Sequence, residues 1–199
     1  MSPTEERVRH LFGTAIEAQI AAADALSQDI AKSAQRLADC LLNDRKILIC
    51  GNGGSSANTF HFSSALINHF GVERPSLPVI NLSGDSMCLN TISDENNYEQ
   101  IFARQIQALG DEGDVLVLLT TSGNSNSILQ AVYAANERGL DTVVLCGRDG
   151  GILTKHLGPS DIALLVNADQ PARVREIHLF ILHCFCDVID HILFSQHVG

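Results

Sequence analysis

The sequence predicts an α/β fold in which a doubly wound, mostly parallel sheet of five strands is flanked by helices. Five short apolar runs have the length of strands, and helical segments lie between most of them. At least three of the runs are apolar throughout, which is typical of strands buried on both faces of a parallel sheet. The predicted strands cover 46–50, 77–82, 114–119, 142–146 and 162–166.

Two helices are predicted before the first strand, over 4–26 and 29–43. Ala, Leu and Ile recur at helical spacing in both segments. Thr4 and Ser27 stand where N-caps are expected. The first helix has more apolar surface than one sheet can cover, so we expect this pair to pack against another subunit.

The remaining helices are predicted among the strands and at the C-terminus. We interpret the chain as a single domain over 1–199, with a helical pair at 1–44 and an α/β core at 45–199. The predicted core helices cover 56–69, about 95–109, 126–138 and 172–194.

Composition excludes several classes of function. The formal charge is −10 and the pI is about 5.1, which disfavours direct binding of nucleic acid or an anionic membrane. The N-terminus has no signal-peptide pattern, and no apolar run approaches the roughly 20 residues of a spanning helix. The six cysteines fall mostly in apolar runs without zinc-finger spacing, so we expect reduced thiols in a cytoplasmic protein.

Two loops after predicted strands have the chemistry of a ligand site. The first, 51–56, is rich in glycine, and the second, 120–125, has four hydroxyl side chains at a helix start. Such a helix start suits a phosphate group. The first loop alone also fits an ordinary turn. In the second loop Ser125 fits an N-cap, but a cap needs one hydroxyl and the other three have no structural role. Neither loop matches a nucleotide-binding motif.

The chain resembles the SIS (sugar isomerase) family over nearly its whole length. The segments "CGNGGSSANTFHF", "ERPSLP", "TTSGNSNSILQA", "GRDGG" and "ARVREIHLFILHCFCDVIDHILF" are similar to that family. Its nearest members form two groups: the sedoheptulose 7-phosphate (phosphoheptose) isomerases and DiaA, which binds the replication initiator DnaA. Both groups are homotetramers with sites at subunit contacts, so the resemblance implies a homotetramer here.

The resemblance also implies roles for individual residues. It assigns His61 and His183 to metal-ligand or catalytic positions, with His183 the catalytic residue of an enzyme. It assigns the sugar pocket to Asn52, Gly53 and Asp94. The phosphate positions are matched by Ser55, Thr120, Thr121, Ser122 and Ser125.

Two departures from the isomerase pattern affect the chemistry. Ala65 stands where the isomerases have a glutamate that is the general base and a zinc ligand, and Arg175 replaces a glutamine. Loss of a general base costs ~10²–10⁴ in rate. Zinc takes about four ligands, and only His61 and His183 remain. His61 also fits a partly buried histidine with a backbone hydrogen bond, and His178 fits a packing or salt-bridge residue.

We therefore expect a phosphosugar-binding homotetramer without ordinary isomerase activity, acting as a DiaA-like regulator with a DnaA-type partner and no cofactor. The alternative is a sedoheptulose 7-phosphate isomerase with a remodelled site, the only case that calls for zinc. A third interpretation is a phosphosugar sensor with another partner. Arg175 is expected to bind the ligand, either at the ligand's hydroxyl groups or at a second phosphate group. Alternatively, it pairs with an acidic side chain across a subunit contact. Leu193 and Phe194 are expected to be exposed partner anchors, although plain hydrophobic anchoring fits them equally.

Overall fold

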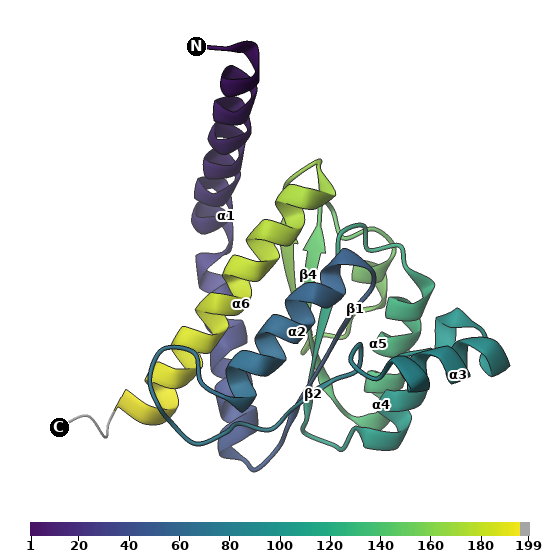
Figure 1. The fold of residues 1–199 in the computed structure, drawn as a ribbon. Coiled ribbons are helices and arrows are strands. Elements are labelled where there is room, and N and C mark those ends of the chain that lie inside the picture. The colour runs from purple at the N-terminus through teal and green to yellow at the C-terminus, as the bar shows by residue number, and fades with distance from the viewer. Residues whose placement is uncertain (196–199) are drawn as a thin grey trace.

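A computed structural model describes residues 1–195 and, at residue 96, the backbone alone. Its centre is a five-stranded sheet with the order β2-β1-β3-β4-β5, and every neighbouring pair is parallel (Figure 1). The predicted fold class is therefore confirmed. The strands are β1 (Ile47–Gly51), β2 (Val79–Asn81), β3 (Val115–Thr120), β4 (Asp141–Gly147) and β5 (Ile162–Val166).

Helices cover both faces of the sheet, and each face has its own apolar core. Because successive strand residues point to opposite faces, Ile47 and Ile49 enter one core while Leu48 and Cys50 enter the other. The first face is covered by α1 (Pro3–Leu42), α2 (Gly54–Ile67) and α6 (Pro171–Phe194). The second is covered by α3 (Ser86–Asn96), η1 (Tyr98–Gln100), α4 (Ala103–Leu109), α5 (Asn126–Arg138) and η2 (Leu153–His156).

The N-terminal region is one continuous helix of 40 residues, so the predicted pair of helices is wrong. Ser2, not Thr4, is the N-cap and accepts a hydrogen bond from the Glu5 amide. Ser27 donates its hydroxyl to the Ala23 carbonyl within the helix and caps nothing. Nothing in its neighbourhood breaks the helix, since serine back-bonding is tolerated inside a helix.

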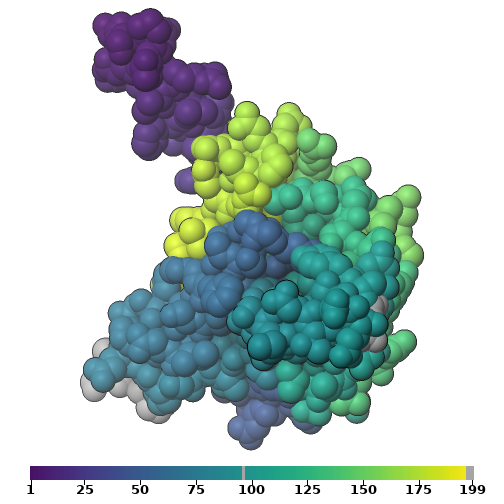
Figure 2. Space-filling view, turned by 45° about the vertical axis from the view of Figure 1, so that its right-hand side comes forward, coloured from purple at the N-terminus to yellow at the C-terminus, as the bar shows by residue number. Residues whose placement is uncertain are grey.

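The first half of α1 projects from the body of the protein (Figure 2). Its apolar side chains are exposed in the single chain, which fits the expectation that another subunit covers them. That expectation stays a prediction. The exposed side chains are Val8, Leu11, Phe12, Ile16 and Ile20.

The segment between β2 and β3 differs most from its prediction. A helix was expected over about 95–109, but Asn97 has a φ of 77°, which no α-helix accommodates. The segment is therefore divided between α3, η1 and α4. The sequence prediction missed α3, whose N-cap Asp85 accepts a hydrogen bond from the Cys88 amide.

The final helix, α6, is long and apolar enough to cross a membrane by length and composition alone, contrary to the expectation that no segment is. In the structure it is a core helix. Ile177, Ile181, Phe185 and Ile189 are buried against α1, α2 and the sheet. This contact accounts for its apolar composition.

Candidate functional site

The two loops identified in the sequence lie together at the carboxyl edge of β1 and β3. The side-chain amide of Asn52 donates to Ser125 Oγ at 2.8 Å and to Ser127 Oγ at 2.7 Å. Its Oδ1 atom accepts from the Tyr98 hydroxyl at 3.0 Å. Asn52 thus connects the glycine-rich loop to the first turn of α5 and to η1. Sequence reasoning missed Ser127, which lies within the segment "TTSGNSNSILQA" but beyond the six-residue loop, and Tyr98, which belongs to no local motif.

Internal hydrogen bonds shape the hydroxyl loop. Thr120 Oγ1 accepts from the Gly123 amide at 3.2 Å, and Ser122 Oγ accepts from the Asn124 amide at 3.3 Å. Gly123 has a φ of 65°, and a Cβ there would lie 1.9 Å from the Gly150 carbonyl oxygen, so only glycine fits. The loop is thereby fixed against the β4–η2 connection, with the Ser122 side chain exposed and that of Thr121 partly exposed.

The other predicted ligand residues are placed around these loops. Gly53 is the N-cap of α2 with a φ of 54°, and Ser55 is buried in the first turn of that helix. Asp94 is exposed on α3, and no hydrogen bond among the described residues links it to either loop. Hydrogen bonds therefore join the two loops to each other, and the role expected of Asp94 stays a prediction.

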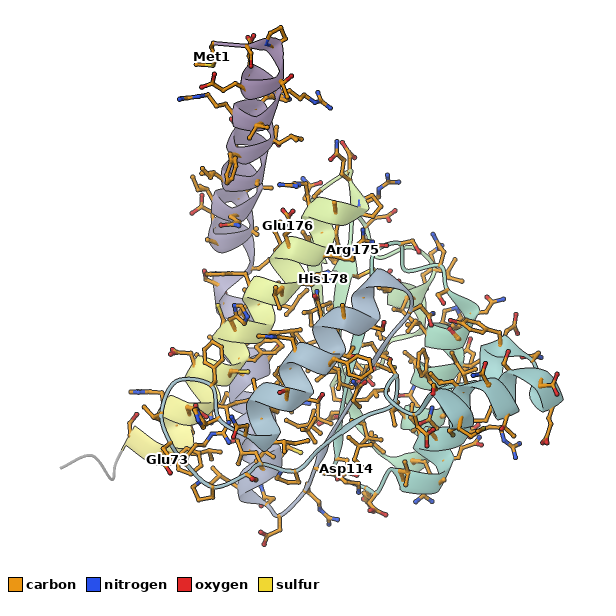
Figure 3. All side chains as sticks on the ribbon, in the orientation of Figure 1. Met1, Glu73, Asp114, Arg175, Glu176 and His178 are labelled. Atoms are coloured by element: carbon orange, nitrogen blue, oxygen red, sulfur yellow. The ribbon has the colours of Figure 1, made fainter. Side chains whose placement is uncertain are left out.

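Arg175 lies at the start of α6, beside the N-terminus of α2 (Figure 3). A Cβ on Gly54 would lie 3.0 Å from Cδ and Nε of Arg175, so this glycine makes room for the guanidinium stem. The carbonyl of Arg175 accepts a hydrogen bond from Asn58 Nδ2 at 2.9 Å. Glu176 points away and pairs with Arg173 at 2.7 Å, so it does not replace the missing carboxylate.

His61 on α2 and His183 on α6 form a direct pair. Their Nε2 atoms are 2.9 Å apart, and the Phe70 ring packs on His183 with ring centroids 5.4 Å apart. Burial, and secondly the neighbouring His61, hold the pKa of His183 below its usual value. At this distance one Nε2 atom donates a hydrogen bond and the other accepts it.

The donor set around this pair does not fit the zinc site of the isomerases. Among the described residues, no three His, Cys, Asp or Glu side chains come together. Ala65 contributes a buried methyl group one turn after His61, and its carbonyl accepts from Arg74 Nη2 at 3.1 Å. Two imidazoles are fewer than the three protein ligands of a catalytic zinc.

His178 is fully buried in the core on the sheet-facing side of α6. Neither ring nitrogen makes a hydrogen bond, although the nearby Cys146 carbonyl slightly favours the protonated ring. Burial lowers the pKa of His178 from 6.5 to about 4, so the ring is neutral. It has no ion-pair partner among the described residues, so the salt-bridge interpretation is wrong and the packing interpretation remains.

Leu193 and Phe194 lie in the last turn of α6. Both are half-buried and pack against the first core, which corrects the expectation that they are exposed. They line a cavity of about 670 Å³ between the end of α6 and the loop after α2. Arg74 Cζ lies 5.8 Å from the centroid of the Phe194 ring.

Comparison with known proteins identifies a family and its named relatives. Residues 12–147 match the SIS domain. A phosphoheptose isomerase from Halorhodospira halophila is 48% identical over 98% of this chain and 99% of its own length. One from Shewanella halifaxensis is 44% identical over 96% and 97%, respectively. The solved structure of a phosphoheptose isomerase from Francisella tularensis has a TM-score of 0.92 and 41% identity, covering 96% of this chain and 100% of that one.

These relatives correct the functional expectation. A DiaA-like regulator that binds DnaA is wrong, because proteins similar over nearly the full length at 44–48% identity are named phosphoheptose isomerase. They favour the alternative interpretation of the sequence. The match over 12–147, the near full-length relatives and the shared fold together show that the chain belongs to the SIS domain family.

Proposed function

We propose that this chain is a cytoplasmic aldose–ketose isomerase that acts on a phosphosugar of the sedoheptulose 7-phosphate class. The relatives named phosphoheptose isomerase support this substrate class. The observation that carries the proposal is the 2.9 Å contact between His61 and His183, because it gives the site paired acid–base groups in the absence of a carboxylate at Ala65.

The reaction moves one proton between adjacent carbons through an enediol. One imidazole takes the proton from the hydroxyl-bearing carbon next to the carbonyl, the paired ring gives a proton to the carbonyl oxygen, and a proton crosses from the first ring to the second along their hydrogen bond. In the second step the second ring takes the enediol's other hydroxyl proton, a proton returns along the same hydrogen bond, and the first ring gives a proton to the former carbonyl carbon. The substrate gains and loses no atoms, and the histidine pair ends in its original protonation state. The lowered pKa of His183 keeps that ring available as the base near neutral pH.

Phosphate recognition is assigned to the hydroxyl loop. Thr121 and Ser122 stand before the N-terminus of α5, where free amides and the helix dipole favour an anion. Asn52 fixes the position of Ser125 in this loop through a hydrogen bond. Arg175 adds a permanent positive charge near the N-terminus of α2 and supports binding of the substrate's hydroxyls or of a second anionic group.

A homotetramer is part of the proposal. The exposed apolar side chains of α1 are the surface that a second copy would cover, as in a helix whose apolar stripe needs a partner.

The two histidines of one chain supply too few ligands for zinc. The proposed acid–base steps therefore depend on the imidazoles.

The test is conversion of sedoheptulose 7-phosphate by the purified protein, with and without added zinc. The proposal expects aldose product that is formed without zinc and is lost in His183→Gln. An absence of conversion under both conditions would contradict it. Activity that appears only with zinc would assign the chemistry to a metal and overturn the role given to the paired rings.

A further inference from the structure

The histidine pair spans two separate helices, so its geometry depends on how α2 and α6 are held together. The two Nε2 atoms are 2.9 Å apart. If the helices move apart by about 1 Å, this separation becomes too long for a hydrogen bond. The two helices lie side by side in Figure 1 and contact each other. The contacts on each side of the histidines therefore determine whether the pair exists.

One contact lies on the N-terminal side of the pair. Asn58 Nδ2 on α2 donates to the Arg175 carbonyl on α6 at 2.9 Å. Asn58 precedes His61 by three residues, so it lies on the adjacent turn of the same helix. This bond joins the helices at the end nearest the phosphate loop.

The other contact is made by Arg74, in the loop that connects α2 to β2. Nη1 of Arg74 donates to the Leu66 carbonyl at 2.8 Å, and Nη2 donates to the Ala65 carbonyl at 3.1 Å. These are carbonyls of the last turn of α2, which have no partner within the helix. Arg74 therefore caps the helix that bears His61, one turn beyond that residue.

The same guanidinium reaches α6. Nε of Arg74 donates to Asp190 Oδ1 at 2.6 Å, and the two side chains are 1% and 8% exposed. Asp190 follows His183 by seven residues, which places both on one side of α6. Because the pair is buried and each nitrogen of the guanidinium has a hydrogen-bond acceptor, Arg74 fixes the C-terminal end of α2 against α6.

The loop that holds Arg74 also supplies a ring contact to the histidine. Phe70 lies four residues before Arg74 and packs on His183 with an interplanar angle of 32°. Figure 3 shows Glu73, the neighbour of Arg74, beside the last turns of α6. Anchoring of the loop through Arg74 therefore also fixes the surface against which His183 rests.

We propose that Arg74 is a positioning residue: with Asp190 it holds α2 and the Phe70 loop against α6 so that His61 and His183 meet. The contribution of Arg74 to catalysis rests on the function proposed above. Its role in holding the two helices together does not. Arg74 itself touches neither imidazole. Asp190 acts through Arg74 in the same way.

The test compares Arg74→Lys and Asp190→Asn with Asp114→Asn in the full-length protein. Asp114 is 1% exposed and pairs with Lys46, which is 23% exposed, at the opposite, N-terminal edge of the sheet, so it is a comparable ion pair with a buried carboxylate. The readout is the NMR signature of the pair at one fixed pH. It consists of the cross-relaxation between the ring protons of His61 and His183, and the shift that the Phe70 ring imposes on His183.

We expect Arg74→Lys and Asp190→Asn to lose or weaken both signals and Asp114→Asn to keep them, even if all three lower the melting temperature. Lysine keeps the charge but lacks the planar set of donors that joins two carbonyls and a carboxylate. In the isomerase assay we expect kcat to fall by about 10²-fold, as for a misplacement near 1 Å, with KM almost unchanged.

Wild-type signals in a folded Arg74→Lys or Asp190→Asn protein would overturn the proposal. If Arg74→Lys does not fold, Asp190→Asn decides alone, because it preserves the shape of the side chain and one acceptor oxygen. Loss of the NMR signature with unchanged kcat would support the positioning of the pair and contradict its role in the proposed function. The two proposals are thereby separated.

Discussion

Nε2 of His61 lies 2.9 Å from Nε2 of His183, so one hydrogen bond joins α2 to α6 through two residues that are 122 positions apart in the sequence. One ring must donate and the other accept, which requires that at most one extra proton is present on the pair. The lowered pKa of His183 satisfies this condition near neutral pH. The pair is therefore ready to take a proton and to give one.

The first prediction concerns this pair. His61→Gln and His183→Gln should each lower kcat for sedoheptulose 7-phosphate by ~10²–10⁴, because each removes one of the acid–base groups. KM should change little, since the hydroxyl loop that is proposed to bind the phosphate is unchanged. Steady-state kinetics measure both. His156→Gln is the control, because that histidine also makes a 2.9 Å contact, with Tyr133 of α5, and takes no part in the pair. Equal losses in all three variants would contradict a special role for the pair.

The second prediction concerns the hydroxyl loop. Sugar phosphates should raise the melting temperature more than free sugars do, and at 100 times Kd their binding should stabilise the fold by ~2.7 kcal/mol relative to the ligand-free protein. Ser122→Ala combined with Ser125→Ala should remove this difference, because both hydroxyls stand at the N-terminal side of α5. Thermal shift assays measure it, with Ser27→Ala on α1 as the control. An unchanged shift in the double variant would place the phosphate elsewhere.

The sequence predicts the strands well because a strand buried on both faces is apolar throughout, as β1 and β3 are. It also predicts the two loops, since both follow such strands directly. It cannot predict the Asn52 network or the Arg74–Asp190 pair, whose partners are up to 116 residues apart and leave no periodic pattern. The division of α1 into two helices failed for a local reason, because serine at position 27 is compatible with both a cap and a helix interior.

The third prediction concerns the lost zinc ligand. Ala65→Glu alone should destabilise the protein by roughly 1–3 kcal/mol, because position 65 is buried and a carboxylate there loses its hydration. Ala65→Glu with Arg175→Gln should gain zinc binding, since the carboxylate then joins the imidazole of His61, one turn earlier on α2, and that of His183 on α6. Isothermal titration with zinc measures this gain.

The matched control for the zinc site is Ser64→Glu with Arg175→Gln, because position 64 is exposed on the same helix and points about 100° around it from position 65. Zinc should bind this control no better than the wild type. Equal binding by both double variants would show that position 65 does not face the pair.

The fourth prediction concerns pH. The pKa of His178 is about 4 in the folded protein and near 6.5 when the chain unfolds. The unfolded state therefore binds the proton first, and stability falls as the pH decreases from about 6.5 towards 4. The shift corresponds to at most about 3 kcal/mol.

His178→Leu should remove this part of the pH dependence, because leucine fills a similar volume and leaves no buried nitrogen without a partner. Urea unfolding at several pH values measures the difference between variant and wild type. His10→Leu, at an exposed position on α1, should keep the wild-type slope. A persistent slope in His178→Leu would assign the acid sensitivity to other groups.

The fifth prediction concerns the last turn of α6. Leu193 and Phe194 are half-buried, pack against the core and line the cavity beside Arg74, so they contribute to the fold itself. Changing both to alanine should lower the free energy of unfolding by about 2 kcal/mol, which is below the loss for two fully buried side chains because each keeps part of its surface in water. Urea denaturation measures the change. Met87→Ala is the control, since Met87 is 75% exposed and its truncation should have almost no effect.

The ring of Phe194 also faces the Arg74 guanidinium. The double variant should therefore weaken the NMR contact between His61 and His183 more than Met87→Ala does. Unchanged stability together with an unchanged contact would mean that the last turn of α6 packs too loosely to support either the core or the Arg74 loop.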